Sequence, residues 1–344
     1  KLIMAYTTIP KSTDYFNTKL YTGNSSADHA ITGVGHAPDF VWLKRRTSNT
    51  DHTLYDAIRG ATKGLRSESA DAEATSTGLT SFDSDGFTVG SAGTQNGGDM
   101  VSWNWKANGQ GSSNTDGSIN TTYTSANTTS GFSICQWTGT GSNATIGHGL
   151  GVAPKMILVK RTNLASDWSV YHNSLAVTDY LVLNTNAGKD GGGATLWNST
   201  APTNSVFSIG TDATVNASGS TYIAYCFSDI QGFSKAGSYT GNGNANGIFQ
   251  YLGFKPAYVL IKNTQANETW MLYDDKRGYN GSMAVLSPDE TAAEISANNI
   301  DFLSNGFKIR TSASTLNTNA QSFIYMAFAE APLVGTNNVP ANAR

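Results

Sequence analysis

The sequence of 344 residues predicts an all-β protein built from three tandem, homologous antiparallel β-sandwich domains of jelly-roll-like form. One phrase, in which a proline precedes an apolar strand that closes at a lysine, occurs three times along the chain. Charged residues make up only 14 %, and the chain is rich in Gly, Asn, Ser and Thr, which is typical of β-proteins with many turns. Short runs of β-branched and aromatic residues alternate with turn clusters, whereas helical periodicity is weak.

The repeated phrase begins at Pro38, Pro154 and Pro256 and reads PDFVWLKRRTSNTDHTLYD, PKMILVKRTNLASDWSVYH and PAYVLIKNTQANETWMLYD. In each copy a first strand closes at a lysine, and a second strand ends at a tyrosine. We interpret the phrase as a folding signature rather than a binding motif. The proline marks the strand entrance, the apolar run fills a sandwich, and the lysine caps the solvated end of the strand. The aligned lysines are Lys44, Lys160 and Lys262.

Further blocks recur in the same order in every copy. Each copy closes on an alternating aromatic strand, which reads MVSWNWKA (100–107), TYIAYCFS (221–228) or SFIYMAFA (322–329). Because side chains alternate with period two, the large residues of each strand share one face. Each copy is far longer than the ~20–50 residues of a solenoid unit, so each is expected to hold its own core.

The blocks predict six segments along the chain. The stretch between the first two copies has few core-forming residues and is interpreted as a linker. The best helical candidate is a short helix over 287–299 in the third copy, since it opens with Ser-Pro-Asp-Glu. The segments are an N-terminal extension (1–14), repeat 1 (15–107), a Gly/Ser/Asn/Thr linker (108–130), repeat 2 (131–230), repeat 3 (231–331) and an extended C-terminal tail (332–344).

Charge and apolar content argue against two classes of partner. The formal net charge is −3, and no long run of Lys and Arg occurs, so a nucleic-acid partner is not expected. No segment approaches the ~18 consecutive apolar residues of a membrane span, so membrane insertion is not expected either.

The apolar start of the chain is too short and too poorly flanked for a signal peptide. Cys135 and Cys226, both in repeat 2, are expected as free buried thiols, with pairing left open.

No catalytic signature is found, so we expect neither enzyme activity nor a cofactor, and no catalytic residue is assigned. Asp83 and Asp85 in the turn FDSDGF could present oxygens to calcium, but a hairpin turn explains the Asp-Gly step better, and no metal is expected. Asp56 and Asp274 follow the shared tyrosine, whereas His172 stands there in repeat 2. A required acid would not be expected to vary in this way.

Trp197 is the candidate for ligand binding by aromatic stacking on a sugar or by contact with a partner. It lies in the glycine-rich stretch GGGATLWNSTAP and has no counterpart in the other repeats. The remaining tryptophans are interpreted as packing residues. Among them, Trp168 and Trp270 share an aligned position that His52 holds in repeat 1.

The phrases DYFNTKLYTGN, GVGHAPDFVWLKRR, LYDAIRGATKGLRS, GLTSFDSDGFTVGS and VSWNWKANG resemble a repeat domain of tailed bacteriophages, especially marine ones. GSNATIGHGLGVAPKMILVKR and YMAFAEAPLVGTNNVPANAR are similar to the same family, so the resemblance spans almost the whole chain. It implies a virion structural protein, commonly fibre-like or part of the tail or capsid surface. It therefore also implies assembly in the host cytoplasm, a place on the surface of the extracellular virion, and other virion proteins as partners.

The leading functional hypothesis is a tail-fibre or receptor-binding component that recognises a host-surface glycan or protein. The alternatives are a capsid decoration or head-fibre protein and a secreted bacterial carbohydrate-binding module. A capsule depolymerase would need paired carboxylates, which the sequence does not reveal. We expect a homo-oligomer, a trimer, because a surface with few charges loses little solvation on association. The tail (332–344) has too few apolar residues to order itself and is expected to lie against a neighbour.

Overall fold

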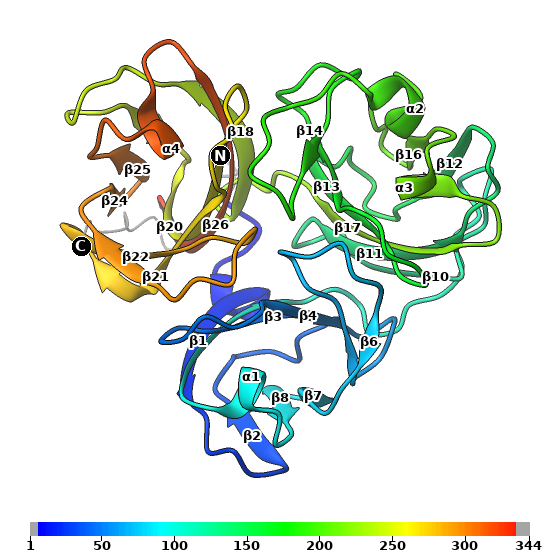
Figure 1. Cartoon of the computed structure of the whole chain (residues 1–344), viewed down its shortest axis with the longest axis horizontal. Helices are drawn as coiled ribbons and strands as arrows, with labels where there is room; N and C mark the ends of the chain where they lie inside the picture. Colours follow the sequence, from blue (N-terminus) through cyan, green and yellow to red (C-terminus); the bar gives the residue numbers. More distant parts are fainter. Residues whose placement is uncertain (1–5, 335–344) are drawn as a thin grey trace, which may run out of the picture.

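The computed structural model describes residues 6–334. It is all-β, with 43 % strand and 6 % helix, and its sheets are antiparallel, which confirms the predicted fold class at this level. Figure 1 shows three lobes around a common centre, which correspond in colour to repeat 1 (blue to cyan), repeat 2 (green) and repeat 3 (yellow to red). Each lobe turns a large sheet toward the centre and carries its smaller strands on the outside.

The strands fall into three groups along the chain. Repeat 1 holds β1 (Phe16–Thr22), β2 (His29–Thr32), β3 (Phe40–Arg45), β4 (Thr53–Asp56), β5 (Lys63–Gly64), β6 (Ala74–Thr75), β7 (Leu79–Asp83), β8 (Gly86–Val89) and β9 (Asp99–Trp105). Then come β10 (Tyr123–Asn127), β11 (Phe132–Thr138), β12 (Ala144–Gly147), β13 (Met156–Arg161), β14 (Ser169–His172), β15 (Leu181–Val182), β16 (Val206–Ile209) and β17 (Thr221–Phe227). Repeat 3 holds β18 (Ser234–Thr240), β19 (Phe249–Tyr251), β20 (Phe254–Asn263), β21 (Met271–Tyr279), β22 (Ser282–Leu286), β23 (Ile295–Ala297), β24 (Ile300–Leu303), β25 (Gly306–Ile309) and β26 (Ser322–Pro332).

The helices of the described chain are single turns. They are η1 (Ser12–Asp14), α1 (Gly93–Asn96), α2 (Gly193–Trp197), α3 (Ala213–Asn216) and α4 (Ser314–Asn317). The turns α1, α3 and α4 precede the closing strand of their repeats, and each ends in a buried asparagine.

The three large sheets share one order over four strands, β1-β9-β3-β4, β11-β17-β13-β14 and β18-β26-β20-β21. The full sheets read β1-β9-β3-β4, β10-β11-β17-β13-β14-β15 and β18-β26-β20-β21-β22-β23. In every sheet the strand with the repeated lysine (β3, β13 or β20) lies between the closing aromatic strand and the strand that contains the shared tyrosine (β4, β14 or β21). These three strands are therefore internal, as the apolar run predicts. Smaller sheets (β2-β8-β7, β12-β16 and β19-β25-β24) complete a β-sandwich-like arrangement.

One hydrophobic core joins the inner faces of all three large sheets. At its centre Trp105, Phe227 and Phe328, the equivalent residues of the three closing strands, contact one another. The ring centroids are 6.2 Å apart for Trp105–Phe227, 5.6 Å for Trp105–Phe328 and 5.9 Å for Phe227–Phe328, in edge-to-face geometry. Edge-to-face contacts of this kind stabilise the fold by more than the burial of their apolar surface alone. The aromatic faces of the closing strands thus bind the repeats to each other.

Three expectations on local structure are corrected. Residues 287–299 form a loop and β23 instead of a helix, because Asp289 accepts a hydrogen bond from the Trp270 amide at 3.0 Å and the segment docks onto repeat 1. The expected linker (108–130) contains β10, which extends the repeat 2 sheet by pairing with β11. In repeat 3 the strand begins before Pro256, at Phe254, and a register shift at the proline accommodates its missing N–H.

Two chain segments were expected to lie outside the repeats. In the N-terminal extension, Ile9 is fully buried in the central core. The tail enters the described structure only at its start, where Pro332 ends β26 and the Leu333 amide bonds to the Gly253 carbonyl at 3.2 Å. The rest of the expected tail lies outside the described residues.

The aromatic triangle leads to a stability prediction. Phe227→Ala should lower the free energy of unfolding by about 3–5 kcal/mol, because it leaves a cavity where three sheets meet. Chemical denaturation followed by tryptophan fluorescence measures this loss. The substitution Leu164→Ala, at a side chain that is 53 % exposed, serves as the control and should change stability by less than about 0.5 kcal/mol. Equal effects of the two substitutions would contradict a shared central core.

Candidate functional site

The shared lysines are buried, which corrects the expectation that they cap solvated strand ends. Lys44, Lys160 and Lys262 have no exposed surface. Each ammonium donates to main-chain carbonyls, and in each case one acceptor belongs to another repeat. These acceptors are Thr291 for Lys44 (3.0 Å), Ala70 for Lys160 (2.8 Å) and Asn186 for Lys262 (3.1 Å). The repeated phrase therefore joins repeats to one another.

The acceptor carbonyls that belong to another repeat lie in three equivalent segments, which we call the arms: residues 66–73, 182–189 and 287–294. The last residue of each arm donates its main-chain N–H to the strand end of the next repeat at 2.8 Å. The pairs are Glu73 with Thr162, Lys189 with Thr264 and Glu294 with Arg46. Repeat 1 thus docks on repeat 2, repeat 2 on repeat 3, and repeat 3 on repeat 1. The contacts close a ring.

The aligned tryptophans reinforce the same interfaces. The Trp168 indole N–H donates to the Arg66 carbonyl at 2.7 Å, and that of Trp270 donates to the Val182 carbonyl at 3.1 Å. Both acceptors are the first residues of arms. Burial lowers the pKa of Lys44, Lys160 and Lys262 to about 8, since desolvation disfavours the ammonium.

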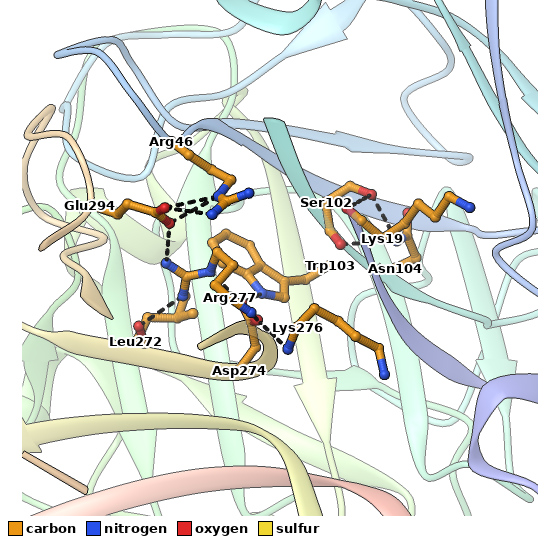
Figure 2. A network of polar contacts seen from close by, with 10 residues as sticks. All are labelled: Lys19, Arg46, Ser102, Trp103, Asn104, Leu272, Asp274, Lys276, Arg277 and Glu294. Atoms are coloured by element: carbon orange, nitrogen blue, oxygen red, sulfur yellow. Dashed lines mark hydrogen bonds and ion pairs between the residues drawn. The ribbon is translucent and has the colours of Figure 1, made fainter. Parts of the chain in front are cut away.

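The acidic position that varies between repeats also lies at the interfaces. Figure 2 shows Asp274 between Arg277 and the Trp103 indole of repeat 1. Its Oδ2 accepts from Arg277 Nε at 2.6 Å and from Trp103 Nε1 at 2.9 Å, and all three side chains are buried. Arg277 also forms an ion pair with Glu294, which in turn pairs with Arg46 of repeat 1 (Figure 2). Repeat 3 is therefore tied to repeat 1 by a buried charged network.

The equivalent carboxylate of repeat 1 makes the corresponding contacts with repeat 2. Asp56 Oδ2 accepts from Arg59 Nε at 2.6 Å and from the Tyr225 hydroxyl at 2.7 Å. Tyr225 aligns with Trp103, so each carboxylate receives a donor from the closing strand of the next repeat. Both acids act in structural networks that hold the ring.

His172 fits the remaining interface. The strand that it faces is β26, the closing strand of repeat 3, which carries Met326 at the position of Trp103 and Tyr225. A methionine side chain has no hydrogen-bond donor. The ring of His172 reaches instead to the Tyr325 carbonyl, with Nε2 at 3.2 Å, while Nδ1 accepts from the Ser174 amide at 3.1 Å. Nδ1 therefore keeps its lone pair and Nε2 carries the hydrogen. The replacement of the acid by histidine follows from what the next repeat offers.

The residues that were singled out from the sequence have structural roles. Trp197 is 1 % exposed and packs edge-on against Tyr171 with centroids 5.9 Å apart, so it cannot stack on a sugar, which corrects that expectation. Asp83 accepts from the hydroxyls of Ser81 and Thr88 at 2.8 and 2.7 Å. Asp85 accepts from the amides of Gly35 and Gly33 at 2.7 and 3.0 Å, and these bonds lower its pKa. Cys135 and Cys226 are free buried thiols.

Sequence reasoning missed a pocket of about 290 Å³ in repeat 1, whose lining is mostly apolar but includes several polar side chains. Its polar lining includes Asp51, Thr53, Arg66, Asp71, Ser76 and Gln95. The signal that could have found it is Gln95, which occupies the position before the final asparagine of the single-turn helix, where repeats 2 and 3 have Val215 and Leu316. All three residues are buried.

The fold and its interfaces define an all-β, three-repeat ring. A family described as a domain of unknown function (DUF7483) matches residues 11–332, and the chain belongs to it. The match covers all three repeats as one unit, in agreement with the closed ring. No curated protein and no solved structure matches the chain.

Two further findings concern residues 6–334. Within this range no helix has the length and apolar character that a membrane crossing requires. The same residues contain no group of three or more His, Cys, Asp or Glu side chains that could hold a metal ion.

The hydrogen bonds of Asp83 and Asp85 predict independence from calcium. Incubation with EDTA should leave the melting temperature unchanged, because protein hydroxyls and amides already occupy the carboxylate oxygens. Differential scanning calorimetry with and without the chelator measures this. A drop of several degrees that calcium restores would show that the native state binds the ion there.

Because the His172 imidazole is buried, we expect acid to weaken the contact between repeats 2 and 3. Burial lowers its pKa to about 4, below the ~6.5 of an unfolded chain. Between these values the unfolded state binds more protons, so stability falls as the pH drops from about 6.5 to 4. His172→Gln keeps a donor and an acceptor but cannot titrate. Its free energy of unfolding should therefore fall less between pH 7.5 and pH 5 than that of the wild type. Parallel pH profiles would contradict this role.

Proposed function

We propose that this chain is a structural and attachment protein of a bacteriophage particle, in the tail fibre or receptor-binding apparatus, without enzyme activity. In this proposal each repeat is a homologous jelly-roll-like β-sandwich domain. The observation that carries the proposal is the closed ring, in which three equivalent sheets use the same buried lysine contact in cyclic order. The resemblance of the sequence to phage repeat domains provides the biological setting.

A ring of three equivalent repeats suits a particle with threefold symmetry. It presents three related surfaces in one direction from a single rigid chain. Several weak contacts made together give firm attachment, because every contact after the first is intramolecular. The same reasoning would suit a capsid decoration or head-fibre protein, and the location in the particle separates these assignments.

A carbohydrate-binding module is the second candidate, and one observation favours it. Phe249 and Tyr251 project from the same face of β19 and are 45 % and 47 % exposed. β19 is the outer strand of its small sheet. Two aromatic rings at alternate positions of an exposed strand can form a platform for sugar rings.

The expected homotrimer remains part of the proposal, with its contacts on outer surfaces, because the ring already uses the inner faces of the large sheets. Light scattering should give a mass about three times the 36.4 kDa of one chain. A mass of one chain at micromolar concentration would contradict self-association through these surfaces.

Immunogold electron microscopy tests the place of the protein. An antibody against the purified chain should label the tail of particles from the phage that encodes it, and the purified chain should slow adsorption of these particles to host cells. Label on the capsid would favour the decoration protein. Absence of the chain from purified particles by mass spectrometry would overturn the virion assignment and leave the carbohydrate-binding module as the better candidate.

A further inference from the structure

Repeat 1, which holds the pocket, departs from the other two repeats at a buried position that lines it. Gly64 faces Tyr55 across the β-ladder, and the equivalent positions are held by Tyr180 in repeat 2 and Val285 in repeat 3. A Cβ on Gly64 would lie 3.0 Å from Thr53 Cγ2 and 3.4 Å from the Tyr55 ring. These contacts are tighter than a Cβ usually makes, so repeat 1 packs Thr53 and Tyr55 closely against a glycine where the other repeats carry a side chain.

The second departure is Gln95. Its side-chain amide is buried, with the residue 5 % exposed, and Nε2 donates to the Thr53 hydroxyl at 2.6 Å. Val215 and Leu316 show that the fold accepts an aliphatic residue at this position, and both are fully buried. Burial of an amide costs free energy that an aliphatic side chain does not incur. The Gln95 amide is held by Thr53 and by the Thr94 hydroxyl, which donates to Oε1, so the amide stands in a fixed orientation at the pocket wall.

Charged groups of both signs stand at the mouth of the pocket. Arg66 Nε binds Asp51 at 2.9 Å, and its NH1 group binds Asp71 at 3.0 Å. The three side chains are partly exposed, at 45 %, 32 % and 62 %, so they can also bind a ligand. Arg66 has no charged counterpart, because Val182 and Ser287 occupy its position in the other repeats.

We infer that this pocket binds one neutral, hydroxyl-rich sugar residue of a glycan. Its volume of about 290 Å³ suits a single sugar ring. The amide, guanidinium and carboxylates offer paired donors and acceptors that match adjacent hydroxyls. Ala72, Ala74 and Ala92 supply an apolar wall for the C–H face of the ring.

The charges at the mouth decide between classes of sugar. Two carboxylates against one guanidinium leave a negative balance, which disfavours uronic and sialic acids and favours neutral residues. This inference names a ligand class for the attachment function proposed above. Only the identity of the surface that displays the glycan rests on that proposed function.

The test uses the purified full-length chain on an array of neutral, amino and acidic glycans, followed by titration calorimetry with the best neutral ligand. Gln95→Val introduces the residue that repeat 2 carries, and Gly64→Val the residue that repeat 3 carries. Each should weaken binding at least tenfold. Gln95→Val should leave the melting temperature within a few degrees of the wild type, whereas Gly64→Val should lower it somewhat, because the added side chain crowds Thr53 and Tyr55. Gln110→Val, at an exposed position, is the matched control and should bind as the wild type does.

Each other outcome overturns the inference. Binding of no glycan, or of acidic glycans alone, would exclude the proposed ligand class. Binding that survives both pocket substitutions but is lost in Phe249→Ala or Tyr251→Ala would move the site to β19. If Gln95→Val unfolds the chain, Gly64→Val and competition by the free monosaccharide, read by saturation-transfer NMR, decide. The presence of the chain in particles is measured separately, so a failed sugar site and a failed virion assignment remain distinguishable.

Discussion

The buried ammonium groups of the shared lysines, each of which takes one acceptor from another repeat, are the constraint on which the ring depends. Removal of a lysine from water costs several kcal/mol unless its donors find acceptors. Lys44, Lys160 and Lys262 each take one acceptor from the arm of a different repeat. Burial of the lysine and docking of the arm are thus one event. The docked arms bring the inner sheet faces together, and the aromatic core forms between them.

The three interfaces share one geometry and differ in their side-chain chemistry. Asp274 receives an indole N–H, Asp56 receives a phenol O–H, and His172 donates to a carbonyl where no side-chain donor is present. Each choice fits what the next repeat presents, so the variation is coupled across the ring. Gly64 and Gln95 also differ from their counterparts, but their contacts with Thr53 and its neighbours lie within repeat 1, so the variation there is not coupled across the ring.

The sequence predicts the all-β class and the internal strands at the shared lysines, because period-two alternation and the aligned phrases depend on local pattern. It does not predict the burial of Lys44, since lysine is rarely buried and the acceptor that stabilises it lies 247 residues away. Trp197 illustrates the reverse error, because a glycine-rich context suggests an exposed loop where the structure has a packed turn. Residues 287–299 begin with helix signals, but docking on repeat 1 overrides them. The only sequence signal of the pocket is Gln95, and it becomes clear once the single-turn helices are aligned and the equivalent residues prove to be Val215 and Leu316.

The direction of the ring has a consequence for synthesis on the ribosome. Lys160 and Lys262 follow their acceptors by 90 and 76 residues, so both acceptors have already been made when these lysines emerge. Lys44 precedes its acceptor by 247 residues. Repeat 1 is therefore translated first, yet its cation stays without the Thr291 carbonyl until most of the chain has been made. The interface between repeats 3 and 1 can form only late in translation, and until then the nascent chain leaves the inner face of its first sheet uncovered by repeat 3.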